Sequence, residues 1–368
     1  MRRTVDIIAI IMLAAAAVAN AAYTVRIRQQ AAAALKPAVQ PPADTVRYAR
    51  LVFAGDLMAH MPMLTAARHY AEGCDADFDF RPMFRHVAER FRRADYAVVN
   101  LETTISHGRY SGYPMFRSPA AVAEAMRYMG VDAAVTANNH CCDGGSAGIT
   151  TTLEVLDSLG ISHTGTFSDS MDYSRNNPHR FKCGGISFAL FAYTYGTNGL
   201  PVPKGRMVNL IDTTAMGRDF AALDRDSTDV GIVFIHWGNE YERQENNRQR
   251  MLADFIRRHG IDIIIGSHPH VVQPFEADST HVTVYSLGNF ISNQQKRYCD
   301  GGLIATIDVE KRPECRPAYK AMLEPAWVMC PGYKIIPPEI GDTIQMTAEQ
   351  RRRYVQFVDD THRTLYGN

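Results

Sequence analysis

The stretch IDIIIGSHPH, residues 261–270, joins an apolar run to a turn that carries two histidines. The run is short, rich in β-branched isoleucine and closed by Gly266, which is typical of a buried strand. Pro269 fixes its own φ and biases His268 toward an extended backbone, so we expect a stiff turn. Neutral imidazole is the commonest side-chain metal ligand. The turn therefore favours a metal site, although two incidental loop histidines remain the competing interpretation.

The rest of the chain repeats this arrangement of an apolar strand followed by polar side chains. Apolar runs at 51–55, 95–99, 132–136 and 230–235 predict further strands, and they alternate with helical periodicity. The expected helices are 81–93, 119–129, 144–159, 214–224, 245–259 (burying Met251, Leu252, Phe255 and Ile256) and a terminal helix from Thr347. Beyond Gly301 the pattern favours antiparallel strands at 303–309 and 320–328. This order predicts one α/β domain with a largely parallel sheet and a β-rich C-terminal part.

Metal-competent groups follow five of the predicted strands. Since sites form at the carboxyl ends of strands in open α/β sheets, we expect these groups to converge. Any one of them has an ordinary alternative as a turn, a loop cap or a core histidine, but five coincidences at one sheet edge are far less plausible. The groups are Asp56, Asn100 with Glu102, Asn138 with Asn139 and His140, His236, and His268 with His270.

The ligands in these clusters are chemically coherent. They comprise carboxylate oxygens, an amide oxygen and imidazole nitrogens, and no thiolate is required. Such mixed ligands suit Mn, Fe or Zn better than a soft metal or Ca. There are enough of them for one divalent metal, or for two if a carboxylate bridges the pair, and paired metals serve phosphoryl displacement.

Bulk composition restricts the partners. Apolar residues make up 46% of the chain, charged residues 21%, and the net charge is zero, the balance of a soluble globular protein. The absence of a basic surplus argues against nucleic acid as a partner. Seven cysteines without any C-x-x-C spacing make a structural zinc knot improbable.

The N-terminus predicts export. Residues 1–28 combine a charged start with an apolar stretch, and Ala19-Asn20-Ala21 offers a cleavage site. The segment therefore predicts a signal peptide or, if it stays uncleaved, a membrane anchor. Residues 29–46 are expected to be a flexible spacer, because they are rich in alanine and proline. Either way the body is expected in the periplasm or at the cell surface.

Six ordered motifs between residues 51 and about 305 resemble the CapA-type poly-gamma-glutamate capsule biosynthesis family, a branch of the calcineurin-like metallophosphoesterases. They are FAGDLM (53–58), VVNLET (98–103), ANNHxxDxG (137–145), HWGNEY (236–241), GSHPHVVQ (266–273) and YSLGNF (285–290). The resemblance implies a four-layer α/β/β/α sandwich with two sheets back to back. We therefore expect a metallophosphatase domain at 47–310, with 311–368 packed on it.

The resemblance also implies roles for single residues. Asp56, Glu102, Asn139, His236, His268 and His270 match metal ligands, with Glu102 in the bridging position, and His140, with Asp56, is expected in catalysis. Asn100, Asn138, Arg117, Glu240, Tyr241 and Asn289 are expected to face the substrate. One departure stands out: the superfamily's first motif is Asp-x-His, but Leu57-Met58 follow Asp56. The first metal site therefore lacks one ligand, for which His60 is a weak substitute.

Two functions fit these features. The first is an exported metal-dependent hydrolase with phosphoesterase-type chemistry, in which His140 is the general acid and the substrate is a phosphoester or an anionic polymer. The second is a non-catalytic metal-binding component of a membrane-associated complex that makes or exports an anionic polymer. The family resemblance favours a capsule role in both cases, and the missing histidine favours weak catalysis.

Overall fold

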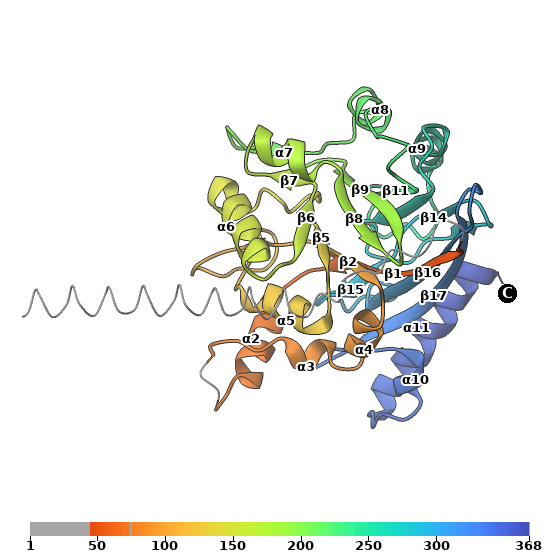
Figure 1. Ribbon diagram of the computed structural model, residues 1–368. Helices are drawn as coiled ribbons and strands as arrows, with labels where there is room; N and C mark the ends of the chain where they lie inside the picture. The colour runs from red at the N-terminus through yellow and green to blue at the C-terminus, as the bar shows by residue number, and fades with distance from the viewer. Residues whose placement is uncertain (1–44, 74–75, 368) are drawn as a thin grey trace, which may run out of the picture. The chain divides into compact units, whose positions relative to one another are not determined.

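The computed structural model describes residues 45–73 and 76–367 (Figure 1). The predicted signal peptide or anchor, and all but the end of the predicted spacer, lie outside the described residues. Within the described part, no helix is both long and apolar enough to span a membrane. Cys74 also falls outside it.

The strands pair into two separate large sheets, as the family resemblance implies, and not into one. The first sheet has the order β18-β17-β16-β1-β2-β5-β6, with β15 paired to the end of β1. Strands β1, β2, β5 and β6 run parallel, whereas β16, β17 and β18 continue the sheet antiparallel. Its strands are β1 Arg47–Leu57, β2 Tyr96–Leu101, β5 Ala133–Val135, β6 Ser162–Thr164, β15 Asn289–Ile291, β16 Gly301–Lys311, β17 Ala318–Met329 and β18 Lys334–Ile336.

The second sheet has the order β13-β14-β12-β11-β9-β8. Its four central strands are parallel, and β8 and β13 close the edges antiparallel. They are β8 His179–Cys183, β9 Ile186–Thr194, β11 Val230–His236, β12 Ile263–Ser267, β13 Phe275–Ala277 and β14 Val282–Val284. Two short pairs join loops: β3 Thr104–Ile105 with β4 Arg117–Ser118, and β7 Thr166–Phe167 with β10 Met207–Val208.

Three apolar cores define four layers. Between the sheets, side chains such as Phe53 of β1 pack against Phe234 of β11 in one buried cluster. The outer face of the first sheet is covered by α2 Met61–Tyr70, α3 Arg81–Phe84, α4 Ala88–Arg92 and α5 Ala121–Met129. The outer face of the second is covered by α8 Thr213–Ala221 and α9 Asn247–Arg258 (Figure 1). The architecture is therefore an α/β/β/α sandwich.

The remaining helices lie at the periphery. They are α6 Gly145–Ser158, α7 Ser170–Asn176, α10 Pro338–Gly341 and α11 Ala348–Tyr366. Helix α11 begins after Thr347, whose side chain and Gln350 form a capping box. It packs on β17 through Tyr354 and Phe357, which contact Trp327 in a satellite cluster.

Two predictions about helices were wrong. The expected helix 81–93 is broken into α3 and α4 at residues 85–87, where Val87 leaves helical geometry (φ −111°) while its side chain stays buried under the first sheet. Met251 was expected in the core but is 70% exposed. The buried stripe of α9 runs through Gln249, Leu252, Ala253 and Ile256, so Met251 faces outward.

Candidate metal centre

Five loops meet at the carboxyl ends of the parallel strands of both sheets. Direct contacts tie them together: Asp56 near the end of β1 contacts Asn100 of β2 and His270 after β12, and Asn139 after β5 contacts His236 of β11. Register makes this possible, because Asp56 lies beside Asn100 in the parallel pair β1–β2 and His236 lies beside Ser267 in the pair β11–β12. The expected convergence of these residues is what the structure displays.

Asp56 is at the centre of the cluster and is fully buried. Its Oδ1 accepts a hydrogen bond from Asn100 Nδ2 at 2.8 Å. Its Oδ2 accepts one from the His268 backbone N–H at 3.3 Å and lies 3.2 Å from His270 Nδ1. One carboxylate thus joins the first sheet to the His-Pro-His turn of the second.

Glu102 is the most telling group in the cluster. It is fully buried, yet neither of its carboxylate oxygens has a hydrogen-bond partner. Burial, and then the negative charge of Asp56, raise the pKa of this carboxyl well above its usual value. The nearest basic group is His236, whose Nε2 lies 3.7 Å from Glu102 Oε1 and whose lowered pKa keeps the ring neutral. A buried carboxylate left uncompensated in this way is strongly destabilising, and a divalent cation would compensate it. Glu102, Asp56 and His236 each offer one ligand atom, and these atoms lie within 4.8 Å of one another.

His236 is held as a neutral nitrogen ligand would be. Its Nδ1 lies 2.9 Å from Ser267 Oγ and its Nε2 lies 2.9 Å from Asn139 Oδ1. Burial, and then the proximity of His268, lower the pKa of His236 well below its usual value. Asn139 Nδ2 donates to Asn198 Oδ1, which leaves the amide oxygen of Asn139 facing the cluster. The residues present therefore fit a divalent metal held by mixed oxygen and nitrogen ligands.

The His-Pro-His turn differs from expectation in its backbone. His268 has φ +98° and His270 has φ +59°, so the prediction of an extended His268 was wrong. Contacts on both sides hold this conformation: Asp56 accepts from the His268 N–H, and the Tyr241 N–H donates to the Pro269 carbonyl at 2.8 Å. Residues at positive φ are strained and cluster at functional sites. His268 Nδ1 is buried without a partner, and burial, followed by His270, lowers its pKa to about 3.

His140 is paired with a carboxylate that we did not single out in the sequence. Its Nδ1 lies 2.7 Å from Asp143 Oδ2, and the same oxygen accepts the Phe116 backbone N–H at 2.6 Å. Phe116 also packs edge-on against the His140 ring, with centroids 4.7 Å apart. The i, i+3 spacing of His140 and Asp143 within one motif was the available signal. The pair fixes the orientation of the His140 ring through one of its two nitrogens.

The residues expected to face the substrate fall into two groups. Asn100, Asn138 and Asn289 are fully buried and hydrogen-bonded within the cluster, whereas Glu240 and Tyr241 are exposed at its rim. Lys296 lies over the Tyr241 ring at 4.7 Å. Asn138 Nδ2 donates to the Leu101 carbonyl, and Arg117 donates to the Asp143 carbonyl at 3.2 Å.

His60 caps the start of α2 and lies edge-on to Phe116, at 4.8 Å between ring centroids. Its Nε2 is buried without a partner, and burial lowers its pKa to about 4. Among the described residues, no hydrogen bond joins His60 to Asp56. Phe116 contacts the rings of both His60 and His140, so His60 belongs to the wall of the site on the His140 side.

A cavity of about 350 Å³ opens beside His268. Aromatic walls come from Tyr195, whose ring centroid is 4.4 Å from that of His268, and from Trp237. Arg248, near the start of α9, and Glu240 contribute charge to its lining. Tyr195 and Arg248 stand outside the motifs, so the sequence did not indicate them.

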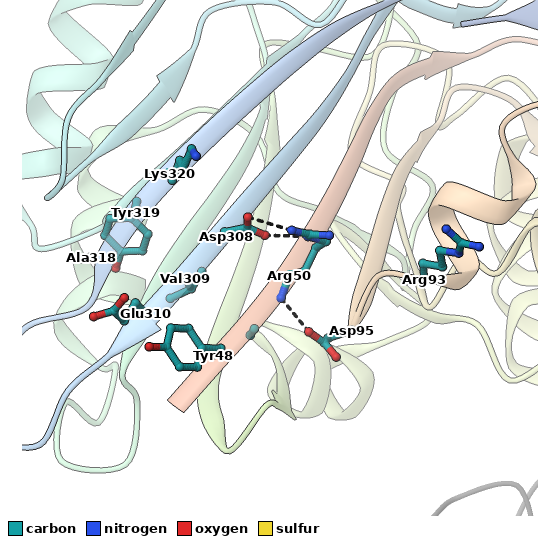
Figure 2. Close-up of a pocket in the computed structure, with 11 residues that line it drawn as sticks. Tyr48, Arg50, Arg93, Asp95, Asp308, Val309, Glu310, Ala318, Tyr319 and Lys320 are labelled. Carbon is teal, nitrogen blue, oxygen red and sulfur yellow. Dashed lines mark hydrogen bonds and ion pairs between the residues drawn. The ribbon is translucent and has the colours of Figure 1, made fainter. Parts of the chain in front are cut away.

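A larger groove of about 520 Å³ lies at the opposite end of β1 and does not compete as a reactive site (Figure 2). Arg50 makes a two-point ion pair with Asp308, at 2.7 and 3.0 Å, and Asp95 accepts the Arg50 backbone N–H (Figure 2). The groove's principal charges are therefore already paired. None of its lining residues belongs to the cluster around Asp56.

Comparisons with known proteins show a family to which the chain is similar. The model of a family described as "Bacterial capsule synthesis protein PGA_cap" matches residues 50–294. The "PGA biosynthesis protein CapA" of Bacillus subtilis (strain 168) is 27% identical over 219 residues, covering 58% of this chain and 57% of that protein. The "Capsule biosynthesis protein CapA" of Bacillus anthracis is 27% identical over 224 residues, covering 58% and 54%. The chain thus matches little more than half the length of these relatives.

A solved structure described as a novel phosphatase from Mycoplasma pneumoniae is also similar. It has a TM-score of 0.45 and 13% identity, and the match covers 76% of this chain and 94% of that one.

Proposed function

The chain belongs to the bacterial capsule synthesis protein family, and from this premise we propose that it is a metal-dependent phosphoester hydrolase. The observation that carries the proposal is the Glu102 carboxylate, buried without a hydrogen bond beside Asp56 and His236. A divalent cation bound there, with Mn, Zn or Fe the best suited, would supply an activated water and polarise a phosphoryl oxygen. We place the ligands on Asp56, Glu102, Asn139, His236, His268 and His270.

His140 is the proposed general acid. Its contact with Asp143 at 2.7 Å holds the ring in one orientation and favours a proton on Nδ1. The opposite nitrogen, Nε2, acts as the acid when the ring carries a second proton there, and the Asp143 carboxylate stabilises this positively charged form. Phe116 fixes the ring plane from the side. A positioned acid of this kind contributes roughly a hundredfold or more to hydrolysis.

The substrate is proposed to be anionic and to enter through the cavity beside His268. Among the described residues, Arg248 lines this cavity without an ion-pair partner, so it can meet a second acidic group of the substrate. Tyr195 and Trp237 offer flat apolar walls for the rest. This arrangement suits a phosphoester that carries an additional acidic group, or an anionic polymer, as substrate. We also propose that the protein works outside the cytoplasm, exported by its N-terminal segment, in contact with membrane-associated capsule proteins.

The proposal is tested with Glu102→Gln, which keeps the shape of the side chain and removes its charge. Purified protein is stripped with chelator, reloaded with Mn²⁺, Zn²⁺ or Fe²⁺, and assayed on bis(p-nitrophenyl) phosphate and p-nitrophenyl phosphate. We expect hydrolysis that depends on the metal and falls at least a hundredfold in Glu102→Gln, together with loss of bound metal. Glu324→Gln is the matched control, since Glu324 pairs with Arg90 on the surface. Undiminished activity in Glu102→Gln contradicts the proposal.

A second function, non-catalytic metal-dependent binding of an anionic polymer, is favoured by one observation. The position two residues after Asp56 is Met58, which is buried, where the superfamily pattern has a histidine ligand. Under this alternative the protein binds metal and retains an anionic polymer such as polyglutamate in a metal-dependent manner, but hydrolyses no ester. Equilibrium binding of the polymer with and without metal, measured beside the hydrolysis assay, separates the two.

A further inference from the structure

Asn289 lies beside Asp56 although the two are far apart in sequence. It begins β15, which pairs parallel with the end of β1 so that Asn289 is in register with Asp56. Both side chains are fully buried. The close approach of the two segments depends on Gly55, where a Cβ would lie 2.1 Å from the Gly288 carbonyl. The fold therefore places a second polar side chain directly against the central carboxylate.

The orientation of the Asn289 amide is fixed by its neighbours. Its Nδ2 donates to the Cys299 carbonyl at 2.8 Å and lies 3.4 Å from the His270 carbonyl, and both of these groups can only accept. Gln294 Oε1, 3.0 Å from the same nitrogen, accepts its other hydrogen. The amide oxygen must then point the other way, where it lies 3.1 Å from His270 Nδ1. His270 Nδ1 in turn lies 3.2 Å from Asp56 Oδ2.

The distances between Asn289 Oδ1, His270 Nδ1 and Asp56 Oδ2 are those expected between neighbouring ligands of one cation. Neighbouring ligands of an octahedral cation with bonds of about 2.1 Å lie roughly 3 Å apart, close to the 3.1 and 3.2 Å separations here. All three side chains are at most 2% exposed. A carboxylate oxygen, an amide oxygen and one imidazole make an oxygen-rich set, which suits Mn²⁺ better than Zn²⁺.

We propose that Asn289 is a metal ligand that completes a second cation site with Asp56 and His270. It supplies the donor that the missing histidine of the Asp-x-His pattern leaves open. The proposal rests on the proposed function, because Asp56 is shared with the cation at Glu102 and His236. It reverses the expectation that the first metal site is weak or empty. It also replaces the expected role of Asn289 in substrate binding with a role as a metal ligand.

A simpler role for Asn289 makes a different prediction. If its oxygen only accepts the His270 Nδ1–H, it orients that ring without touching the cation. Loss of an orienting residue weakens affinity but leaves the number of protein ligands unchanged. Loss of a ligand opens a coordination position that water fills. The count of metal-bound waters therefore separates the two roles.

The experiment uses the full chain loaded with Mn²⁺ alone. Metal content after dialysis is measured by mass spectrometry, affinities by titration, and bound waters by proton relaxation, for wild type, Asn289→Ala and Asn289→Asp. Asn293→Ala is the matched control. Asn293 follows β15, four residues after Asn289, and its side chain accepts a hydrogen bond from the Tyr333 hydroxyl. We expect wild type to bind two Mn²⁺. In Asn289→Ala, one of the two Mn²⁺ should bind at least tenfold more weakly and carry one more bound water. Asn289→Asp should retain both Mn²⁺.

Three results overturn the proposal in distinguishable ways. Wild type that binds one Mn²⁺ and still hydrolyses phosphoesters removes the second site and leaves the proposed function intact. Weaker binding in Asn289→Ala with an unchanged water count reduces Asn289 to an orienting role. Wild type that binds no Mn²⁺ at all removes this inference, and the proposed function falls with it only if the protein binds neither Zn²⁺ nor Fe²⁺.

Discussion

Asp143 is a buried carboxylate that accepts a hydrogen bond from the backbone and also contacts His140, the proposed general acid. Its Oδ2 accepts the Phe116 N–H and contacts His140 Nδ1, while Oδ1 is buried without a partner. The residue is 1% exposed, so its contacts are shielded from water. Low dielectric strengthens such hydrogen bonds. Asp143 thus belongs functionally with His140, although it cannot reach a substrate itself.

Asp143→Asn is expected to impair catalysis without loss of metal. An amide oxygen in the place of Oδ2 can still accept from Phe116 and from His140 Nδ1, but it carries no charge to stabilise the doubly protonated ring from which Nε2 gives its proton. Hydrolysis of an alkyl phosphodiester, whose leaving group needs a proton, should fall about a hundredfold. Hydrolysis of a p-nitrophenyl ester should fall much less, and metal content should stay the same. Asp157→Asn, which disturbs the Asp157–His163 pair, is the control, and equal losses on both esters contradict the role.

Single residues were predictable where they end a strand. Asp56, Asn139, His236 and the two turn histidines were identified because polar groups after parallel strands share one sheet edge. Tyr195 lies in the loop after β9 and Arg248 in the first turn of α9; both were missed because only tertiary packing brings them to the cavity. The roles given to Asn100 and Asn138 in substrate binding stay predictions, and their complete burial favours a supporting role instead.

At the scale of elements, β12 depends on a position without a side chain. A Cβ at Gly266 would lie 2.0 Å from the Tyr285 carbonyl and 2.6 Å from Trp237 Nε1. Trp237 Nε1 itself donates to that carbonyl at 2.9 Å. Gly266 therefore lets the end of β12 approach both the segment after β14 and the Trp237 ring. Ser267 and His268 follow immediately, so this packing sets the position of metal ligands.

Gly266→Ala is expected to lower both stability and metal affinity. Overpacking of this kind costs about 1 to 3 kcal/mol or more, because the neighbouring backbone must move. Urea unfolding of the metal-free protein measures the loss, and titration with Mn²⁺ measures the weaker binding. Gly196→Ala is the control, since a Cβ there meets no atom within 4 Å. Wild-type affinity in Gly266→Ala would show that β12 does not position His268.

Element types were predictable from periodicity, but their interruptions were not. The capping box at Thr347 and the stripe of α9 follow local rules that a sequence displays. The break between α3 and α4 follows no such local rule, because packing against the first sheet determines where the Val87 side chain is buried. The same limit explains Met251, which is apolar yet lies off the buried stripe.

At the scale of the whole molecule, a second contact ties the two sheets together away from the metal centre. Tyr96 of β2 stacks on Phe181 of β8 with ring centroids 3.7 Å apart, and its hydroxyl lies 2.6 Å from His179 Nε2. Burial, and then the nearby His163, lower the pKa of His179 to about 4. His179 must therefore be neutral in the folded protein near neutral pH.

His179 is expected to make the fold sensitive to acid. Its folded pKa lies below the unfolded value of about 6.5, so the unfolded state binds more protons as pH falls between these values, and stability is lost in that range. The shift corresponds to at most about 3 kcal/mol. His179→Gln should therefore lose less stability than wild type between pH 7 and pH 4 in urea unfolding. The exposed His362→Gln should behave as wild type; equal acid sensitivity in His179→Gln contradicts the assignment.

The sandwich itself was predictable only through resemblance. The strand and helix order indicated a largely parallel sheet, but the partition into two sheets depends on which distant strands pair, and local periodicity does not encode that. The six motifs supplied the missing information, and membership of the family is now confirmed. The proposed division at residue 310 stays a prediction, since β16 to β18 continue the first sheet without a break.

The turn that carries Asn139 and His140 continues directly into Cys141 and Cys142. Both thiols are buried and free, with their sulfur atoms 3.9 Å apart, whereas Cys315 is exposed. A thiol reagent can reach the buried pair only when this turn opens. Slow labelling read on the peptide that holds Cys141 and Cys142, apart from that of the buried Cys299 and compared with the fast reaction of Cys315, therefore reports the opening of the turn that carries His140. The rate at which these two thiols are labelled is thus a measure of motion at the site, and ligands that hold the turn closed should lower that rate.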